Sequence, residues 1–223
     1  MLRKILKILA IIFAIILLLL GAAAYGGYRF YKSVFRLSYE EVAASLQPTP
    51  SRCDTFSKCE LLPGDILIRR YVTHVTDLFD ITLNPYFTHS AFYIGNDEIF
   101  EAEGNQVPPQ DQIVIRSLSK SDWFLPDMVD FAIVRPKNYS GKVADIVSKL
   151  TAIADDPAYT FGLLAQDAKT VSCSDIILKY LIDDSVIQDI PKKPSAITPD
   201  YLFWVAVRHP EDFDIIGYNI NPK

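Results

Sequence analysis

The longest apolar run of the chain lies near its start. Ile8–Tyr28 spans 21 residues without a charged side chain and follows a short basic segment, Met1–Lys7. About 20 consecutive apolar residues cross the hydrocarbon core of a bilayer as a helix, so this run predicts an uncleaved membrane anchor. A cleaved signal peptide is the alternative, with Ile8–Leu20 as its apolar core and Ala22-Ala23-Ala24 as its small-residue cleavage site.

Alternating and helical patterns replace the continuous apolar run in the rest of the chain. Alternation of apolar and polar residues predicts strands, which we assign to Asp65–Arg70, Ser90–Ile94, Ile99–Glu103, Gln112–Ser117, Met128–Arg135 and Asp212–Ile220. A 3.6-residue period with capping residues predicts helices, which we assign to Ser38–Leu46, Ser140–Ala154, Cys173–Ile182 and Asp200–Val205. This mixture predicts the α+β fold class.

The chain divides into three parts. Residues 1–30 form the anchor or signal segment, residues 31–60 form a linker with a short helix and the pair Cys53/Cys59, and residues 61–223 form one globular domain. The two linker cysteines lie close together in a polar, proline-flanked stretch. They can form a disulfide if the domain is exported, and they remain thiols in a reducing compartment. A zinc site is not expected, because no second Cys/His cluster completes a ligand set.

The net charge of −5 hides an uneven distribution. Residues 1–36 hold six of the 22 basic residues and no acidic residue, so the remainder carries 16 basic and 27 acidic residues. Such an acidic globular part argues against nucleic-acid binding. Three basic residues lie on each side of the apolar run, so positive charge selects no orientation. The free N-terminus and the cysteine pair favour a single-pass membrane protein with its domain on the extracytoplasmic side.

Cys173 stands at the start of a predicted helix. Ser172 is a favourable N-cap, and Asp175 three residues later completes a Ser-x-x-Asp capping signal before an apolar-periodic run. In the first turn of a helix, free N–H groups and the positive end of the helix dipole stabilise a thiolate and can donate to an oxyanion. A small buried core cysteine is the alternative interpretation, and it is the commoner one unless a histidine lies nearby.

His89 is the histidine best placed to act as the base. It opens the predicted strand Ser90–Ile94, a turn follows at Gly95–Glu98, and Glu101 lies in the returning strand. A histidine and a carboxylate on two strands of a hairpin can share one face of a sheet, where they supply a base and its orienting group for a cysteine nucleophile. We interpret the other two histidines, His74 and His209, as structural or surface residues.

Four short motifs, in this order along the chain, resemble a known family. They are Gly64-Asp65-Ile66-Leu67-Ile68, the run from His89 to Gly95, Phe100-Glu101-Ala102, and Ser172-Cys173-Ser174-Asp175. The order is similar to that of the permuted papain-like amidases of the YiiX/YaeF/YebB group, relatives of the NlpC/P60 hydrolases, over roughly Leu61 to Phe213. The resemblance implies a circularly permuted papain-like fold, with an antiparallel sheet packed against the cysteine helix.

The same resemblance implies roles for individual residues. Cys173 is expected to be the nucleophile, His89 the base and Glu101 the orienting group. Ala158–Gly162 resembles the tyrosine-containing segment that precedes the cysteine in this family, so Tyr159 is expected to line the site. Ser172 is also expected at the cleft or oxyanion pocket. Packing of Tyr159 in an ordinary loop is an equally good interpretation. No cofactor and no metal are expected.

These patterns predict a membrane-tethered or exported cysteine hydrolase of the amidase or peptidase type. Its substrate would be an amide, such as a cell-wall (peptidoglycan) peptide or another γ-glutamyl-like amide. One alternative uses the same residues on a lipid ester or thioester, since the permuted papain core is also similar to the lecithin–retinol acyltransferase group. The other alternative is a membrane-anchored binding module without catalytic activity.

Overall fold

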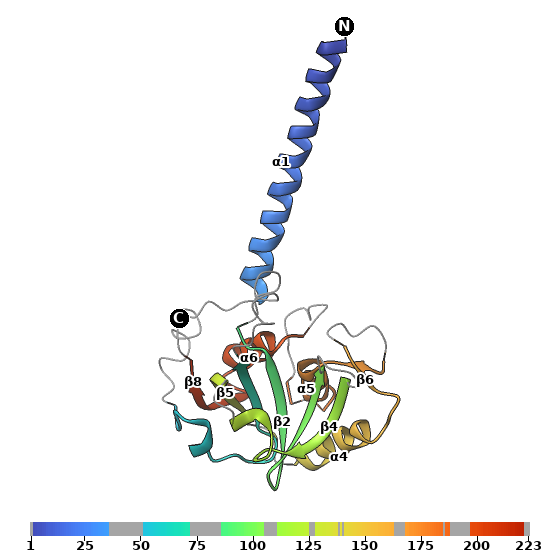
Figure 1. The fold of residues 1–223 in the computed structure, drawn as a ribbon. Coiled ribbons are helices and arrows are strands. Elements are labelled where there is room, and N and C mark those ends of the chain that lie inside the picture. Colours follow the sequence, from blue (N-terminus) through green and yellow to red (C-terminus); the bar gives the residue numbers. More distant parts are fainter. Residues whose placement is uncertain are drawn as a thin grey trace.

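The computed structural model describes residues 2–35, 51–71, 86–104, 111–124, 128–137, 139, 141–162, 168–184, 186–187 and 197–220. The predicted helix Ser38–Leu46, His74 and the cap residue Ser140 lie outside these ranges. The described residues form a long N-terminal helix and a mixed α+β part with an antiparallel sheet (Figure 1). The predicted fold class is therefore confirmed at this level.

The N-terminal helix α1 (Leu2–Phe35) extends away from the sheet in Figure 1. Its segment Lys7–Arg29 is long and apolar enough to cross a membrane, and none of it is buried inside the protein. Large apolar side chains such as Phe13 and Leu18 are 63% and 74% exposed. A continuous apolar surface of this kind is typical of a segment that contacts lipid. The prediction of a helix of membrane-spanning length is confirmed, and a signal sequence shares this property.

We expect the full-length chain to stay in the membrane fraction after washing with high salt and to be released by detergent. Salt screens charge interactions but leaves the burial of apolar side chains in lipid intact. Proteolysis of intact spheroplasts then shows on which side of the membrane the domain lies. We expect the domain to be digested from outside. Protection of the peptides that contain Cys173 would place the domain in the cytoplasm. A mature chain that begins after Ala24 would identify a cleaved signal.

The six-stranded antiparallel sheet has the strand order β4-β3-β2-β1-β5-β8. Its strands are β1 (Ile66–Tyr71), β2 (His89–Gly95), β3 (Glu98–Gly104), β4 (Asp111–Ser117), β5 (Met128–Pro136) and β8 (Phe213–Asn219). Each lies within one residue of a predicted strand at both ends. Asn96 and Asp97 connect β2 to β3 with positive φ angles of 53° and 65°, as a type I′ hairpin turn requires. Two short strands, β6 (Thr160–Phe161) and β7 (Thr170–Val171), form a separate parallel pair.

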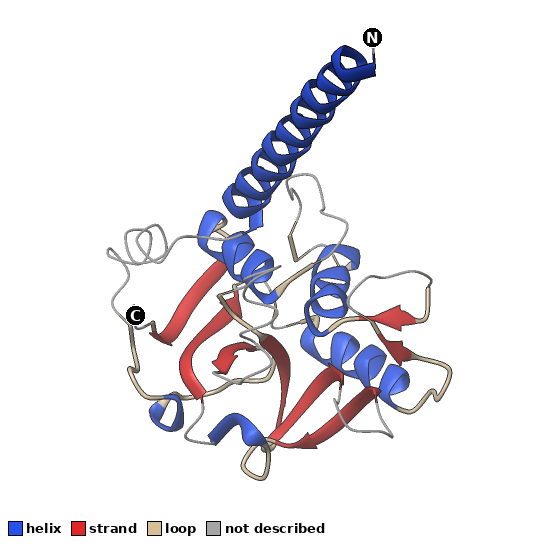
Figure 2. Ribbon diagram, turned by 45° about the horizontal axis from the view of Figure 1, so that its top comes forward, coloured by secondary structure: helices blue, strands red, loops and turns tan. Residues whose placement is uncertain are grey.

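Three helices cover one face of this sheet (Figure 2). They are α4 (Val143–Ala154), α5 (Cys173–Asp183) and α6 (Pro199–Arg208). Their apolar side chains pack against alternate strand positions such as Ile66 and Ile68, because successive side chains of a strand point to opposite faces. The N-cap of α4 is Lys142, two residues after the predicted cap, and the helix begins at Val143.

The opposite face of the sheet is covered by two short 3-10 helices and their neighbours. These are η1 (Phe56–Lys58) and η2 (Asp122–Phe124). Their buried aromatic residues Phe56 and Trp123 pack against Leu67 and Phe131 of the sheet. Since both faces of the sheet are buried, any charged side chain on it has to be paired or hydrogen-bonded.

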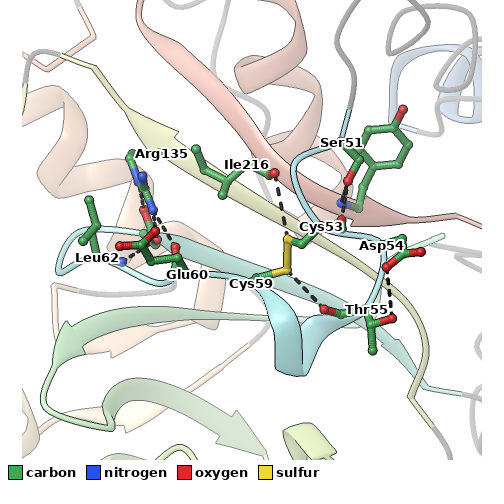
Figure 3. The surroundings of a disulfide bond; sticks show 11 residues. Ser51, Cys53, Asp54, Thr55, Cys59, Glu60, Leu62, Arg135 and Ile216 are labelled. Carbon is green, nitrogen blue, oxygen red and sulfur yellow. Dashed lines mark hydrogen bonds and ion pairs between the residues drawn. A yellow bond between two sulfur atoms is a disulfide. The ribbon is translucent and has the colours of Figure 1, made fainter.

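Cys53 and Cys59 are joined by a disulfide beside β8 (Figure 3). The bond lies directly against Gly217 of that strand, since a Cβ atom at this position would come within 2.1 Å of Cys53 Sγ. Cys173 is the free cysteine, and it is buried. The structure thus has the pairing that we expect for an exported domain.

Candidate active site

Helix α5 begins at Cys173, as its sequence predicts. Ser172 is the N-cap in an extended conformation, and its side-chain oxygen accepts a hydrogen bond from Asp175 N–H at 3.1 Å. A helix leaves its first N–H groups without partners inside the helix. The Ser172 side chain accepts from the N–H group of Asp175. The N–H groups of Cys173 and Ser174 can therefore donate to an acceptor outside the helix. Ser172 therefore shapes the first turn, and its direct contact with a substrate stays a prediction.

His89 and Glu101 lie where two neighbouring strands separate. The paired residues of β2 and β3 run from Gly95 with Glu98 to Phe92 with Phe100. His89, at the start of β2, is paired instead with Arg69 of β1, the other neighbour of β2 in the sheet. His89 and Glu101 lie beyond the last pair of the β2–β3 ladder.

The start of α5 meets the sheet at this separation. Helix α5 contacts both β2 and β3, and the hydroxyl groups of Ser174 and Ser90 are 2.9 Å apart. The opening between the strands thus brings the first turn of α5 beside His89. If β2 and β3 were paired along their whole length, backbone hydrogen bonds would join them at this position.

The three predicted catalytic residues form one chain of contacts. Nε2 of His89 lies 3.1 Å from Oε1 of Glu101, and the His89 ring lies close enough to the Cys173 thiol for each group to shift the pKa of the other. Since Nε2 is used by Glu101, Nδ1 is the ring nitrogen that remains for Cys173. The side chains of His89 and Glu101 are 9% and 0% exposed, and Cys173 is 9% exposed. The structure thus brings the three candidate residues together in a buried position.

Glu101 is surrounded by groups that favour its ionised form. Its Oε1 accepts a hydrogen bond from Trp123 Nε1 at 2.5 Å, and its Oε2 lies 2.7 Å from Arg116 Nε. Burial alone would raise the pKa of this carboxyl group. The hydrogen bond and charge of His89, with the charges of Arg69 and Arg116, outweigh burial and lower the pKa to about 2. Glu101 is therefore a carboxylate at neutral pH.

Cys173 and His89 shift each other's pKa in opposite directions. Burial alone would raise the pKa of the thiol, but the hydrogen bond and charge of His89, the Ser174 hydroxyl and the Ser90 backbone N–H lower it to about 7. Burial alone would lower the pKa of His89, but its hydrogen bonds with Cys173 and Glu101 raise it to about 9. The Cys173 thiolate forms above a pH of about 7, and the His89 imidazolium persists below a pH of about 9. The ion pair is therefore the main form between these two pH values, and the pair titrates in two coupled steps.

Arg69 forms a second layer beneath these residues. It is fully buried, its guanidinium carbon lies 4.3 Å from the centre of the Trp123 ring, and two of its nitrogens contact the Asp122 carboxylate at 2.7 and 3.1 Å. The bidentate pair fixes Asp122, and with it the start of the short helix that carries Trp123. Arg69 and Trp123 thus define the wall behind Glu101.

Several supporting residues were not predicted as part of the site. Trp123 is fully buried, and its hydrogen bond to Glu101 places it beside the candidate catalytic residues. Arg116 occupies an ordinary polar position in the alternation of its strand, opposite Ile99, so the sequence gives no signal that it contacts a buried carboxylate. Ser90 and Ser174 have no distinctive sequence signal, since buried serines are common.

Tyr159 lies among charged neighbours on another part of the domain surface. Its ring is 5.5 Å from the Lys169 ammonium, and it interacts electrostatically with Lys179 and Tyr180. These two α5 residues lie about two helical turns from Cys173. These contacts match the interpretation of Tyr159 as a packed loop residue, and its role at the cleft stays a prediction.

One group of residues offers atoms that could contact a metal ion. His209, Glu211 and Asp212 have ligand atoms within 4.8 Å of one another in the turn that follows α6. Nδ1 of His209 contacts Glu211 Oε1 at 3.0 Å, and the Glu211 side chain is 64% exposed. Exposed acidic groups commonly cluster without an ion, and we assign this turn no metal.

Replacing Glu101 with glutamine is expected to lower turnover about ten- to hundredfold, because the amide can still contact His89 but no longer supplies its charge. Loss of the charge should also lower the pKa of His89 and so narrow the pH range in which the ion pair persists. Kinetics on a cleaved amide, together with the pH dependence of Cys173 alkylation, measure both effects. Glu98→Gln, at the turn end of the same strand, is the matched control. Equal turnover in both variants would show that Glu101 does not orient the base.

A scan of the sequence against protein-family models found no match, and a search of the curated proteins found none.

Proposed function

We propose that this chain is a membrane-tethered cysteine hydrolase that cleaves an amide bond. One observation carries the proposal: Cys173, at the first position of α5, is buried beside His89, which is hydrogen-bonded to the buried Glu101 and lowers the pKa of the thiol. A core cysteine that serves only packing needs no such partners, and burial without them raises its pKa. Here the surroundings lower the pKa to about 7.

The acylation step follows from these positions. The Cys173 thiolate attacks the carbonyl carbon of the amide, and the electron pair of the C=O bond moves to the oxygen. The N–H groups of Cys173 and Ser174 are placed to donate to this oxyanion. The carbonyl re-forms as the C–N bond breaks, and His89 Nδ1–H gives its proton to the leaving amine. A thioester on Cys173 and a neutral imidazole remain.

Deacylation uses the same residues in the opposite direction. A water molecule gives a proton to Nδ1 of His89 as its oxygen attacks the thioester carbonyl. The Cys173 thiolate then leaves, and the carboxylic acid is released. Glu101 stays ionised throughout, holds the imidazole ring through Nε2 and stabilises the imidazolium whenever it forms. No residue outside the three is needed to balance the protons.

We also propose that the domain has the permuted papain-like arrangement. Support comes from the chain order, in which the histidine strand β2 and the carboxylate strand β3 precede the cysteine helix α5. Packing of the start of α5 against these two strands of an antiparallel sheet gives further support.

The extracytoplasmic location of the domain belongs to the same proposal. The Cys53–Cys59 disulfide supports it, because stable disulfides form in oxidising compartments. The preceding helix of membrane-spanning length would then hold the domain at the outer surface of the membrane. Amide bonds of cell-wall peptides lie within reach of such an enzyme.

Product analysis tests the proposed reaction. Detergent-purified full-length protein is incubated at pH 8 with peptidoglycan fragments and, separately, with phospholipid vesicles, and the products are identified by mass spectrometry. We expect a peptide cleaved at an amide bond, with a transient thioester on Cys173. Transfer or release of a fatty acyl chain would support the lipid-directed alternative. Absence of a Cys173 adduct with every substrate and with thiol-reactive amide probes would support the binding module.

A further inference from the structure

The loop closed by the Cys53–Cys59 disulfide places one aromatic ring close to the candidate active site. This loop carries Phe56, which is 4% exposed. The Phe56 ring stacks on Trp123, with ring centres 5.6 Å apart and planes inclined by 25°. It also meets Phe131 and Phe124 edge to face, at 5.5 and 5.4 Å. The loop thus inserts one ring into the apolar cluster on the face of the sheet opposite the helices.

Trp123 connects this ring to the catalytic residues. Its Nε1 donates to the same carboxylate oxygen of Glu101 that His89 contacts, and its ring centre is 6.0 Å from that of His89. The position of the indole therefore helps to set where Oε1 lies. A shift of the indole would admit water beside Glu101, and a higher local dielectric weakens the attraction between Glu101 and His89.

The loop is held at both ends and in its middle. Arg52 N–H donates to the Ile216 carbonyl at 3.0 Å, and Arg135 Nη2 donates to the Glu60 carbonyl at 3.0 Å. Between these points the disulfide joins Cys53 to Cys59 (Figure 3). Its sulfur atoms lie directly against Gly217. The short helix η1 inside the loop makes turn hydrogen bonds but has no side-chain cap. The disulfide is thus the covalent constraint on the segment that presents Phe56.

We propose that Phe56 is a positioning residue of the active site, and that the Cys53–Cys59 disulfide keeps it in place. The ring of Phe56 holds Trp123, Trp123 holds the carboxylate of Glu101, and Glu101 orients His89 toward Cys173. The linker between the membrane segment and the domain is therefore part of the catalytic apparatus. This inference rests on the proposed function, because it concerns the reactivity of the same cysteine.

Four variants of the full-length protein test this chain of contacts. Phe56→Ala removes the ring, Phe56→Leu retains apolar volume without the stacking, and Cys53→Ser/Cys59→Ser opens the loop. Phe213→Ala is the matched control, since Phe213 is equally buried but packs in the cluster on the helix-covered face of the sheet. The readout is the rate of Cys173 carboxamidomethylation by iodoacetamide as a function of pH, followed by mass spectrometry of the Cys173 peptide.

We expect the alkylation rate at pH 7 to fall about tenfold in Phe56→Ala, as is typical when a supporting group is lost. Smaller falls are expected in Phe56→Leu and in the double serine variant. Phe213→Ala should lower the melting temperature as much as Phe56→Ala does, but should keep the wild-type alkylation profile. If Phe56→Ala does not fold, Phe56→Leu and the double serine variant carry the test.

Two contrary results have different meanings. If Cys173 of the wild-type protein reacts only at alkaline pH, the proposed function is wrong, and this inference is wrong with it. A wild-type protein that reacts near pH 7, with profiles left unchanged by Phe56→Leu and by opening the disulfide, overturns this inference alone. Equal losses in Phe56→Ala and Phe213→Ala also overturn it, because they would reflect general destabilisation.

Discussion

Replacement of Cys173 by alanine is expected to abolish turnover. In the proposed mechanism the thiolate forms the covalent bond to the acyl group, and the three cysteines of the chain leave no substitute, because Cys53 and Cys59 are joined to each other. Removal of a nucleophile from a unit of this kind typically costs about 10⁶-fold in turnover. The measurement is cleavage of the amide identified by product analysis, with the acyl-enzyme followed by mass spectrometry.

Folding of the Cys173→Ala variant is not expected to be at risk. The substitution deletes one sulfur atom from a buried position, and small deletions of this size typically cost about 0.5–1.5 kcal/mol. Lys179→Ala, at an exposed position of the same helix, is the control for a change in α5 and should retain most of the activity. Undiminished turnover in folded Cys173→Ala would exclude covalent catalysis by this residue.

Replacement of His89 by alanine is the second large effect. We expect turnover to fall about 10³- to 10⁴-fold, because the thiolate loses its counter-ion and the leaving amine loses its proton donor. His209→Ala makes the same substitution at the end of α6 and should be almost silent. Both variants are compared by turnover and by thermal unfolding. A loss in His89→Ala no larger than that in His209→Ala would show that His89 is not the base.

The effects of these substitutions should not be additive. Arg116, Glu101, His89 and Cys173 form a row in which positive and negative charges alternate when the ion pair is present. Removing one member leaves its neighbours buried without compensation, which costs more than the loss of a single contact. A double variant at His89 and Cys173 should therefore be about as inactive as either single variant.

The sequence predicts the six strands of the sheet and the three helices that cover it well, because their signals are local. Apolar, aromatic or alternating runs mark the strands, and the cap formed by Ser172 and Asp175 marks the first residue of α5. The pairing of His89 with Glu101 is also accessible from the sequence, since a tight hairpin brings the two strands together. In each case the information lies within a few residues of the element.

The support around the site depends on contacts between distant segments. Trp123 is hydrogen-bonded to Glu101, which lies 22 positions earlier in the chain. Phe56 precedes the first strand of the sheet, yet it stacks on Trp123, which follows β4. The Arg69 side chain is fully buried although its residue type is usually exposed. No local period or motif marks such residues, because their positions follow from the tertiary packing. The register of β1 and the path of the disulfide loop become known only with the structure.

The pH dependence of Cys173 alkylation tests the thiolate–imidazolium pair most directly. The wild-type protein is treated with iodoacetamide across a pH series, and modification of the Cys173 peptide is followed by mass spectrometry. The surroundings of the thiol place the midpoint near its pKa of about 7, below the value of about 8.5 for a free cysteine. In His89→Ala the dominant remaining influence is burial, which raises the pKa of the thiol, so the midpoint should move above that of a free cysteine. A wild-type midpoint at alkaline pH that His89→Ala leaves unchanged would contradict the pairing and the hydrolase mechanism built on it.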